Sequence, residues 1–241
     1  RREGHTALVH TAAASNLGQM LNKICIKDGI GLVNIVRSAE QADILRKIGA
    51  THICDSTSAT FMEDLTQALI AAYAVGASES GHELRRMRLA TLDFPLLRSQ
   101  RSWQHDPLPP VLQPAQDDIA WAQHLVLFFP LWLGDMPALL KGFLEQVARP
   151  GFAFKPKGDN PFGNKGLTGR SARVVCTMGM PALVYRWYFR AHSVKSLERN
   201  VLGFVGIAPV NETLIGMVDR LGDEGVRGWC DKLRKLGATA T

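Results

Sequence analysis

Two short loops carry the residues whose types best suit binding of a flat ring. The first, Pro130–Asp135, follows the most apolar run of the sequence, and its proline, leucines, tryptophan and glycine offer a flat apolar surface with free backbone amides. The second, Thr177–Met180, contains Gly179, which permits a turn without a Cβ and leaves amide N–H groups exposed. The alternative is that Trp132 and Leu133 are core or dimer-interface residues.

Two side chains downstream of these loops can hold or transfer a proton. Tyr185 has a hydroxyl, and His192 changes charge near neutral pH. Each also has a structural interpretation, because Tyr185 can belong to an aromatic cluster and His192 can cap a helix. The four cysteines are scattered and form no C-x-x-C, so the sequence predicts neither a metal site nor a disulfide framework.

A hydroxyl-rich segment precedes the helix expected from Phe61, where an anion could bind. The candidate residues are Ser56, Thr57 and Ser58. Hydroxyls and unpaired amides at a helix N-terminus can hold a phosphate. The competing interpretation is local, because Thr60 and Glu63 have the spacing of a capping box, which would satisfy the same amides.

These candidates must be positioned by alternating elements. Strands are expected at Thr6–His10, Ile30–Val36, Thr51–Cys54, His82–Leu89, Leu125–Pro130, Ala172–Met178 and Val201–Ile207. Helices are expected at Leu17–Lys27, Ala39–Ile48, Phe61–Ala77, Ala115–Gln123, Pro137–Val147, Val184–Asn200 and Val218–Leu236. The alternation predicts an α/β fold with a doubly wound parallel sheet, in which Leu125–Pro130 is a central strand. Because ligands bind beyond the carboxyl ends of such strands, we expect the two loops to share one cleft.

Charge and hydropathy exclude several classes of protein. The net charge of +6 and the pI near 9.3 raise the question of a nucleic-acid partner. The basic residues are spread along the chain, however, and an electropositive mouth for phosphorylated cofactors explains the balance as well, so we expect no nucleic-acid partner. The most apolar run, His124–Gly134, is too short to span a membrane. No cleavage site follows the N-terminal residues, and we expect a cytoplasmic protein.

From about Asp64 to its end, the chain resembles the flavodoxin-like NAD(P)H dehydrogenase (quinone) family. The resemblance is carried by Gly81–Leu84, Leu92–Leu97, Phe129–Lys141, Arg149–Phe154 and Thr177–Pro181, in the order of the family. It implies a flavodoxin-like fold with bound FMN or FAD, NAD(P)H as co-substrate, a quinone-like acceptor and a homodimer. The resemblance assigns to the flavin Pro130, Leu131, Trp132, Leu133, Gly134, Thr177, Met178, Gly179 and Met180.

The same resemblance implies catalytic roles for two residues. Hydride arrival at the flavin N5 puts negative charge on the N1–C2=O side of the ring, which fixed donors stabilise. Tyr185 would donate to the reduced flavin, and His192 would neutralise charge or protonate the quinol.

The first segment, residues 1–63, resembles part of the nucleotide-binding domain of medium-chain, zinc-type dehydrogenases and quinone oxidoreductases. The resemblance is carried by Ala7–Gly18, Leu32–Arg37 and Leu45–His52, and it implies a partial Rossmann βαβαβ segment in which only Gly18 remains of the glycine pattern. Arg37 stands where an acidic residue would hold the ribose of NAD, so it favours the 2′-phosphate of NADP; the alternative is a solvated surface arginine.

The family-like domain, residues 64–241, lacks the strand with which the family begins. A flavodoxin-like sheet needs a strand between His82–Leu89 and Leu125–Pro130, and Thr51–Cys54 is the candidate by chain order. We predict that Thr51–Cys54 joins the larger sheet, while Thr6–His10 and Ile30–Val36 pack as an adjacent unit. The chain is then either a real fusion or a splice of two reading units.

The leading functional hypothesis is a flavin-dependent two-electron oxidoreductase that passes hydride from NAD(P)H to a quinone-like acceptor by ping-pong exchange. One alternative is a non-catalytic nucleotide-binding or regulatory subunit, as in family members that associate peripherally with a potassium-efflux channel. Others are an inactive fusion, or a dehydrogenase that depends on the N-terminal segment. A flavin absorbance spectrum separates the first from the rest.

Overall fold

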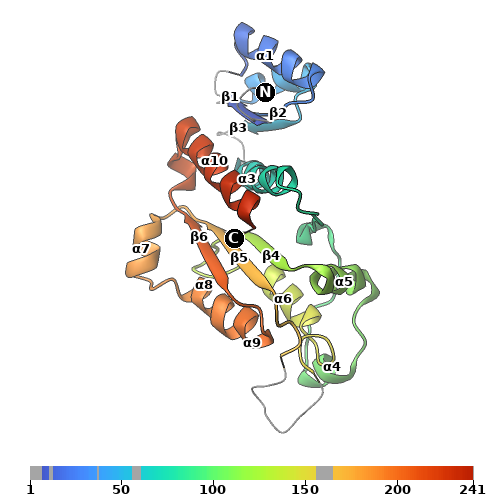
Figure 1. Cartoon of the computed structure of the whole chain (residues 1–241). Coiled ribbons are helices and arrows are strands. Elements are labelled where there is room, and N and C mark those ends of the chain that lie inside the picture. Colours follow the sequence, from blue (N-terminus) through green and yellow to red (C-terminus); the bar gives the residue numbers. More distant parts are fainter. Residues whose placement is uncertain (1–6, 11–12, 37, 56–60, 156–164, 241) are drawn as a thin grey trace. The chain divides into compact units, whose positions relative to one another are not determined.

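The structure is a computed structural model that describes residues 7–10, 13–36, 38–55, 61–155 and 165–240 (Figure 1). Helices and parallel strands alternate, as the sequence predicts for an α/β protein. The chain forms two compact units: Arg1–Leu84 together with Met217–Ala240, and Arg85–Gly216. Within the described ranges, no helix is both long and apolar enough to cross a membrane.

The first unit contains a three-stranded parallel sheet in the order β1-β2-β3. Its elements are β1 Ala7–His10, α1 Asn16–Lys27, β2 Gly31–Val36, α2 Ala39–Lys47 and β3 His52–Asp55. The Ser15 hydroxyl caps α1 by accepting from the Gly18 N–H at 3.1 Å, which satisfies one amide of that turn internally. Asn22 and Asn34 are buried and exchange two side-chain hydrogen bonds of 2.8 and 2.9 Å, which join α1 to β2.

Two long helices complete this unit, α3 Phe61–Glu79 and α10 Gly222–Thr239, with a short 3₁₀ turn at Val218–Arg220. They pack closely because each has a glycine where the other helix approaches. A Cβ added at Gly76 would lie 1.9 Å from the Arg234 carbonyl oxygen, and one at Gly237 would lie 2.0 Å from that of Tyr73. An ion pair between Arg234 and Glu79, 2.6 Å from Nη2 to Oε2, joins the same helices.

The second unit is built on a parallel sheet in the order β4-β5-β6, formed by β4 His124–Pro130, β5 Ser171–Thr177 and β6 Val210–Ile215 (Figure 1). The expected parallel pairing of Leu125–Pro130 with Ala172–Thr177 is confirmed, with Pro130 opposite Thr177. β5 is the central strand and is buried along almost its whole length. β4 is therefore an edge strand of the described sheet, and its expected central position is wrong.

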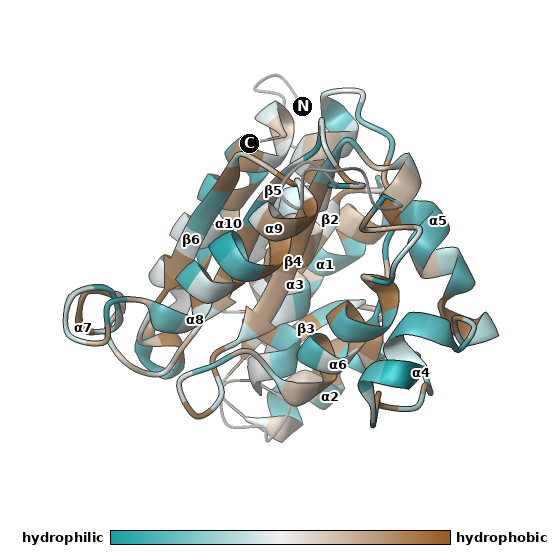
Figure 2. Cartoon of the chain, turned by 90° about the horizontal axis from the view of Figure 1, so that it is seen from below, coloured by the Kyte–Doolittle hydropathy of each residue, from teal (hydrophilic) through white to brown (hydrophobic). Residues whose placement is uncertain are grey.

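Helices and turns surround this sheet. They are η1 Leu89–Thr91, α4 Gln100–His105, η2 Pro110–Leu112, α5 Gln113–Trp121, α6 Ala138–Val147, α7 Ala182–Trp187, α8 His192–Ser196, a π-helical turn at Leu197–Leu202 and α9 Gly203–Val205. Val174 and Cys176 of β5 pack in one apolar core with residues of α6 and α8. In Figure 2 the strand β4 is largely hydrophobic, whereas α4 and α5 are largely hydrophilic.

A buried arginine holds the proline-rich connection between Thr91 and Pro114. The Arg149 guanidinium donates to the carbonyl oxygens of Ser102 and Asp106 at 3.0 and 2.6 Å. The indole N–H of Trp103 donates a hydrogen bond to the Ala148 carbonyl oxygen at 3.1 Å. The connection is therefore ordered by hydrogen bonds to the end of α6.

Three sequence-based expectations about the elements after α3 are wrong. Residues His82–Leu89 do not form a strand, because the described sheet offers this arginine-rich segment no neighbour to pair with. The helix expected at Val184–Asn200 is divided by a turn between α7 and α8. The apolar run Val201–Ile207 ends a helical segment at Gly206, whose φ is +107°, and the strand lies further on, at Val210–Ile215.

The prediction that Thr51–Cys54 joins the larger sheet is also wrong. Within the described residues, β3 pairs only with β2, from Val33 opposite His52 to Val36 opposite Asp55. The short helix α2 returns the chain directly beside β2, which is the ordinary result of a β–α–β connection. The local β–α–β connection therefore determines where β3 pairs, and β3 does not supply the strand that was expected in the second sheet.

Candidate functional site

A tight turn follows β4. Trp132 and Asp135 exchange two backbone hydrogen bonds of 2.8 and 2.9 Å, and the residues between them, Leu133 and Gly134, have φ values of 49° and 82°. Positive φ at both central positions is typical of a type I′ turn. Leucine adopts this conformation at a cost of about 1–2 kcal/mol, and the Leu133 side chain is fully exposed. Strain of this kind is concentrated at functional sites.

The loop after β5 is held close to the end of β6. The Leu131 N–H donates to the Thr177 carbonyl at 2.7 Å, which joins the ends of β4 and β5. Gly216 lies so near the loop that an added Cβ would be 2.3 Å from the Ala182 nitrogen and 2.7 Å from the Met180 oxygen. The Thr177 hydroxyl is buried without a hydrogen-bond partner in the described structure, which leaves one polar group for a ligand or water.

A second strained turn joins α7 to α8. Arg190 and Ala191 have φ values of 54° and 49°, although neither is a glycine. The turn is fixed by a 3.0 Å bond from the Ala191 N–H to the Tyr185 carbonyl, and Ala191 is buried. Its geometry sets the positions of Phe189 and His192, which flank it.

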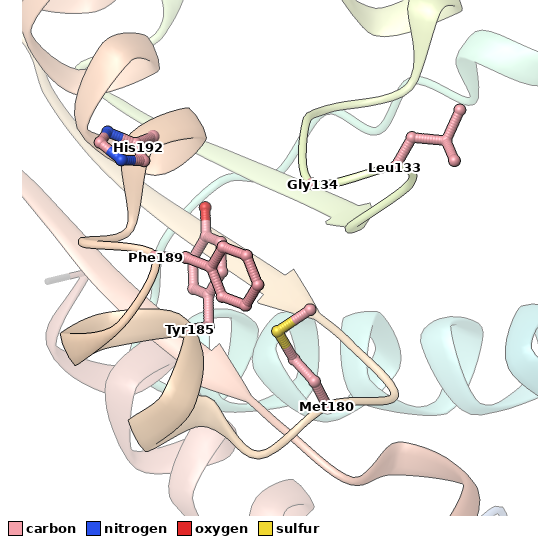
Figure 3. Close-up of a pocket in the computed structure, with 6 residues that line it drawn as sticks. All are labelled: Leu133, Gly134, Met180, Tyr185, Phe189 and His192. Carbon is pink, nitrogen blue, oxygen red and sulfur yellow. The ribbon is translucent and has the colours of Figure 1, made fainter.

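These loops meet at one pocket of about 240 Å³, lined by Leu133, Gly134, Met180, Tyr185, Phe189 and His192 (Figure 3). In Figure 3 the Met180 side chain points toward the rings of Tyr185 and Phe189, and the turn carrying Leu133 and Gly134 lies across the pocket. The lining is largely apolar, with one phenol hydroxyl and one imidazole. Such a surface suits a flat ring with polar edges.

The backbone adds donors to this lining. Within the described structure, the N–H groups of Leu133, Gly134 and Met180 donate to no acceptor in the chain. Amides that are not needed by the fold remain available to a bound ligand. The apolar walls and the free amides together fit the ring of a flavin.

Tyr185 is the buried polar group of the pocket. Its side chain is 1% exposed, and its hydroxyl oxygen accepts from the Val194 N–H at 3.4 Å. Burial raises the pKa of Tyr185, which hydrogen bonds from the neighbouring backbone partly oppose and the nearby Cys176 thiol reinforces. Burial likewise raises the pKa of Cys176, to about 12, so that both groups are neutral at physiological pH.

The structure brings five of the proposed site residues to the pocket: Leu133, Gly134, Met180, Tyr185 and His192. The others lie near the same strand ends but do not line it. Trp132 is exposed, Met178 is in the core, Thr177 is buried, Gly179 is exposed, and Pro130 and Leu131 are partly buried at the end of β4. Ser56, Thr57, Ser58 and Arg37 lie outside the described residues.

Tyr185 belongs to the apolar core, as its structural interpretation predicts, but not through the aromatic cluster that the sequence suggested. Tyr188 and Phe189 pack edge to face with ring centroids 4.9 Å apart, but Tyr185 makes no described ring contact with them. His192 is the first residue of α8 and provides no side-chain cap. The sequence reasoning gave no site role to Phe189, which the structure places in the pocket lining.

A known protein family matches most of this chain. The protein-family model described as "Flavodoxin-like fold" matches residues 56–232, well over half of the chain. The chain belongs to this family. The flavodoxin-like fold and the resemblance drawn from the spaced motifs are therefore confirmed.

Several curated relatives of this flavodoxin-like chain are oxidoreductases. A ribosyldihydronicotinamide dehydrogenase-like protein of Penicillium crustosum is 37% identical over 71 residues, which is 27% of this chain and 26% of that protein. An uncharacterized NAD(P)H oxidoreductase of Haemophilus influenzae is 28% identical over 118 residues, 48% of this chain and 57% of that protein. The chain thus spans from about a quarter to just over half the length of these relatives.

Solved structures support the fold. An NAD(P)H:quinone oxidoreductase from Methanothermobacter marburgensis superposes with a TM-score of 0.61 at 24% identity, covering 73% of this chain and 89% of that one. An FMN-dependent NADH-azoreductase from Bacillus anthracis, solved in complex with FMN, superposes with a TM-score of 0.54 at 17% identity, covering 77% and 92%.

Proposed function

We propose that this protein is a flavin-dependent two-electron oxidoreductase that passes hydride from NAD(P)H to a quinone-like acceptor by ping-pong exchange. The observation that carries the proposal is the pocket, where Leu133, Gly134, Met180, Tyr185 and His192 meet at the carboxyl ends of β4 and β5. These residues come from the turn after β4, the loop after β5, and the helices α7 and α8. Their convergence follows the rule that ligands of parallel α/β sheets bind beyond the carboxyl ends of the strands.

The relatives support this choice of chemistry. Besides the NAD(P)H oxidoreductase described above, an FMN-dependent NADH:quinone oxidoreductase of Haemophilus influenzae is 29% identical over 94 residues, 39% of this chain and 44% of that protein. We therefore propose FMN as the flavin and NADH or NADPH as the donor.

Each pocket residue has a distinct part in the proposal. Leu133, Gly134 and Met180 hold the ring between an apolar surface and free amides. A bound flavin supplies the hydride acceptor and donor. Tyr185 donates a hydrogen bond to the negative charge that develops on reduction, and His192 neutralises charge or gives a proton to the reduced acceptor.

The proposal leads to a specific expectation for flavin affinity. The ring half of the site is assembled within Arg85–Gly216. The proposed phosphate residues Ser56–Ser58 lie outside the described residues, so the described site supplies contacts for the ring alone. We expect the purified protein to carry substoichiometric FMN and to bind added FMN with micromolar rather than nanomolar affinity.

The test is titration of the purified chain with FMN, followed by flavin fluorescence, and then stopped-flow mixing with NADH or NADPH. Bleaching of the flavin absorbance by the nucleotide, and its return on addition of a quinone, support the proposal. The double-reciprocal plots should be parallel, as for ping-pong exchange. Flavin binding without bleaching would instead favour the non-catalytic nucleotide-binding role.

Gly134 gives a matched test of the ring site. Gly134 and Gly169 have φ values of 82° and 81°, and a Cβ added at either meets no atom within 4 Å. Alanine therefore introduces the same strain, about 1–2 kcal/mol, at both positions. Only Gly134 lines the pocket, so Gly134→Ala should weaken FMN binding about tenfold more than Gly169→Ala at equal loss of stability. Equal FMN affinities in the two variants would remove the turn from the site.

We further propose that the protein is a homodimer, joined through α7. Leu183, Trp187 and Tyr188 are strongly exposed on and directly after this short helix, and they adjoin the pocket residue Phe189. Light scattering should give a dimer for the wild type and a monomer for Trp187→Glu. A monomeric wild type would contradict the proposal.

A further inference from the structure

Two walls of the pocket come from different parts of the second unit. One is the turn after β4, which carries Leu133 and Gly134. The other is formed by α7 and α8, which carry Tyr185 and His192. In Figure 3 the two walls lie on different sides of the pocket. Their separation therefore determines whether a flat ring can contact both of them at once.

Asp135 connects these two walls through its side chain. Its Oδ1 atom accepts from the Met136 N–H at 2.7 Å, which caps the turn locally, and it also accepts from the hydroxyl of Ser193 on α8. The backbone N–H and C=O of Asp135 close the turn with Trp132. One residue thus completes the turn and attaches it to the helix that bears His192.

The bond from Ser193 to Asp135 is shielded from water on its helix side, because Ser193 is only 4% exposed. A hydrogen bond to a carboxylate in such surroundings is stronger than one on the open surface. The turn needs this support, since Leu133 has a φ of 49° and a fully exposed side chain, whose packing does not hold the turn in place. A strained backbone persists where its surroundings over-determine it.

We propose that Asp135 is a positioning residue of the ring site, and that its bond to Ser193 fixes the turn against α8. The inference rests on the proposed function, in which a flavin ring lies between the two walls. Asp135 is not among the residues that line the pocket in the described structure, so it acts through the turn and not on the ligand. With the bond in place, the amides of Leu133 and Gly134 are preorganised, and binding of the ring does not have to order them.

A first experiment follows the turn in the ligand-free chain by ¹⁵N relaxation at the Gly134 amide. We expect an order parameter of about 0.85 in the wild type, as in a rigid backbone, and below about 0.6 in Ser193→Ala. This variant removes the bond between the walls but leaves the cap at Met136, so a loss of rigidity comes from the attachment to α8. Ser171→Ala is the matched control, because it removes one bond, 2.7 Å to the His124 Nδ1, at the opposite end of β5. An unchanged order parameter in Ser193→Ala would overturn the proposal.

A second experiment measures the affinity for lumiflavin, which has the flavin ring without the ribityl and phosphate groups. A turn that keeps the competent arrangement for a tenth of the time binds a ligand tenfold more weakly, so we expect a loss of about tenfold in Ser193→Ala. Asp135→Ala should lose at least as much, and the double variant should bind no more weakly than Asp135→Ala, because the two changes remove one shared bond. Asp135→Asn keeps an oxygen that accepts from both donors and should stay within about threefold of the wild type.

The two experiments separate the positioning role from the function on which it rests. Losses of affinity that add in the double variant would mean that the two residues act independently, and the proposal would fail. It would also fail if lumiflavin affinity stays at the wild-type value while the urea midpoint falls, which is the result expected of a purely structural bond. A wild type that binds no lumiflavin would reject the proposed function, and the order parameters of the ligand-free chain would still decide whether Asp135 and Ser193 fix the turn.

Discussion

Tyr185→Phe is expected to lower kcat with a quinone acceptor about 10²-fold, because removal of one preorganised donor to a developing charge typically costs that much. FMN affinity should change little, since the phenyl ring that lines the pocket is retained. The apolar environment that raises the Tyr185 pKa also strengthens its hydrogen bonds. The measurement is steady-state turnover of the FMN-loaded protein, compared at equal flavin occupancy.

The matched control is Tyr188→Phe. Tyr188 is 79% exposed and lies outside the pocket, so its variant should have wild-type turnover. If both variants keep wild-type kcat, Tyr185 is a packing residue and the aromatic-cluster interpretation stands.

The pH dependence follows from the direction of the Tyr185 shift. The phenol is a donor only while it is protonated, so the activity that depends on it is present below its pKa and lost as the pH rises through that value. Because burial raises this pKa above the ordinary tyrosine value of 10.0, the alkaline loss should lie above pH 10. If activity instead falls near neutral pH, and falls in the same way in Tyr185→Phe, then the group that titrates is not Tyr185.

Sequence reasoning located the site because the relevant signals are local. The apolar runs that become β4 and β5 end at the loops that line the pocket, and parallel pairing brings those ends together. Phe189 was given no site role because its position depends on the turn at Arg190 and Ala191. Neither residue type favours positive φ, so nothing in the sequence indicates that turn.

The errors share a physical cause, which is that a strand depends on its neighbours. His82–Leu89 was expected as a strand, and Thr51–Cys54 was expected to fill the place between it and Leu125–Pro130; both expectations failed together. Val201–Ile207 has strand-like composition but ends as a helix at Gly206, whereas Val210–Ile215 is a strand despite Asn211 and Glu212, because an edge position tolerates polar side chains. The Asp135–Ser193 contact joins residues far apart in sequence and carries no local signal.

The boundary of the matched family segment differs from the boundary between the two compact units. The family model begins at residue 56, while the compact units place α3 and α10 with the N-terminal sheet. The helices α3 and α10 therefore begin within the matched family segment but belong to the same compact unit as the dehydrogenase-like N-terminal segment. The tight glycine-to-backbone packing of α3 on α10 explains why these two helices remain together.

Gly216→Ala is expected to destabilise the second unit by about 2–3 kcal/mol and to distort the pocket, because no side chain fits where this residue meets the loop after β5. Its Cβ would lie 2.3 Å from the Ala182 nitrogen and 2.7 Å from the Met180 oxygen, and backbone atoms at such distances must move. Met180 lines the pocket, so the displacement should also weaken FMN binding. Gly228→Ala is the contrasting control, since its added Cβ in the helix α10 meets nothing within 4 Å and should stabilise by about 0.5–1 kcal/mol.

Urea unfolding followed by tryptophan fluorescence measures this effect, because most of the tryptophans report on the second unit. They are Trp103, Trp121, Trp132 and Trp187 there, and Trp229 in the other unit. Performing the Gly216→Ala comparison in a Trp229→Phe background restricts the signal to the unit that contains Gly216, whereas Gly228→Ala is compared in the chain that retains Trp229. If the urea midpoint of Gly216→Ala equals that of the parent, the loop at Met180 accommodates the added Cβ without loss of stability. The proximity of β6 would then not be what fixes that wall of the pocket.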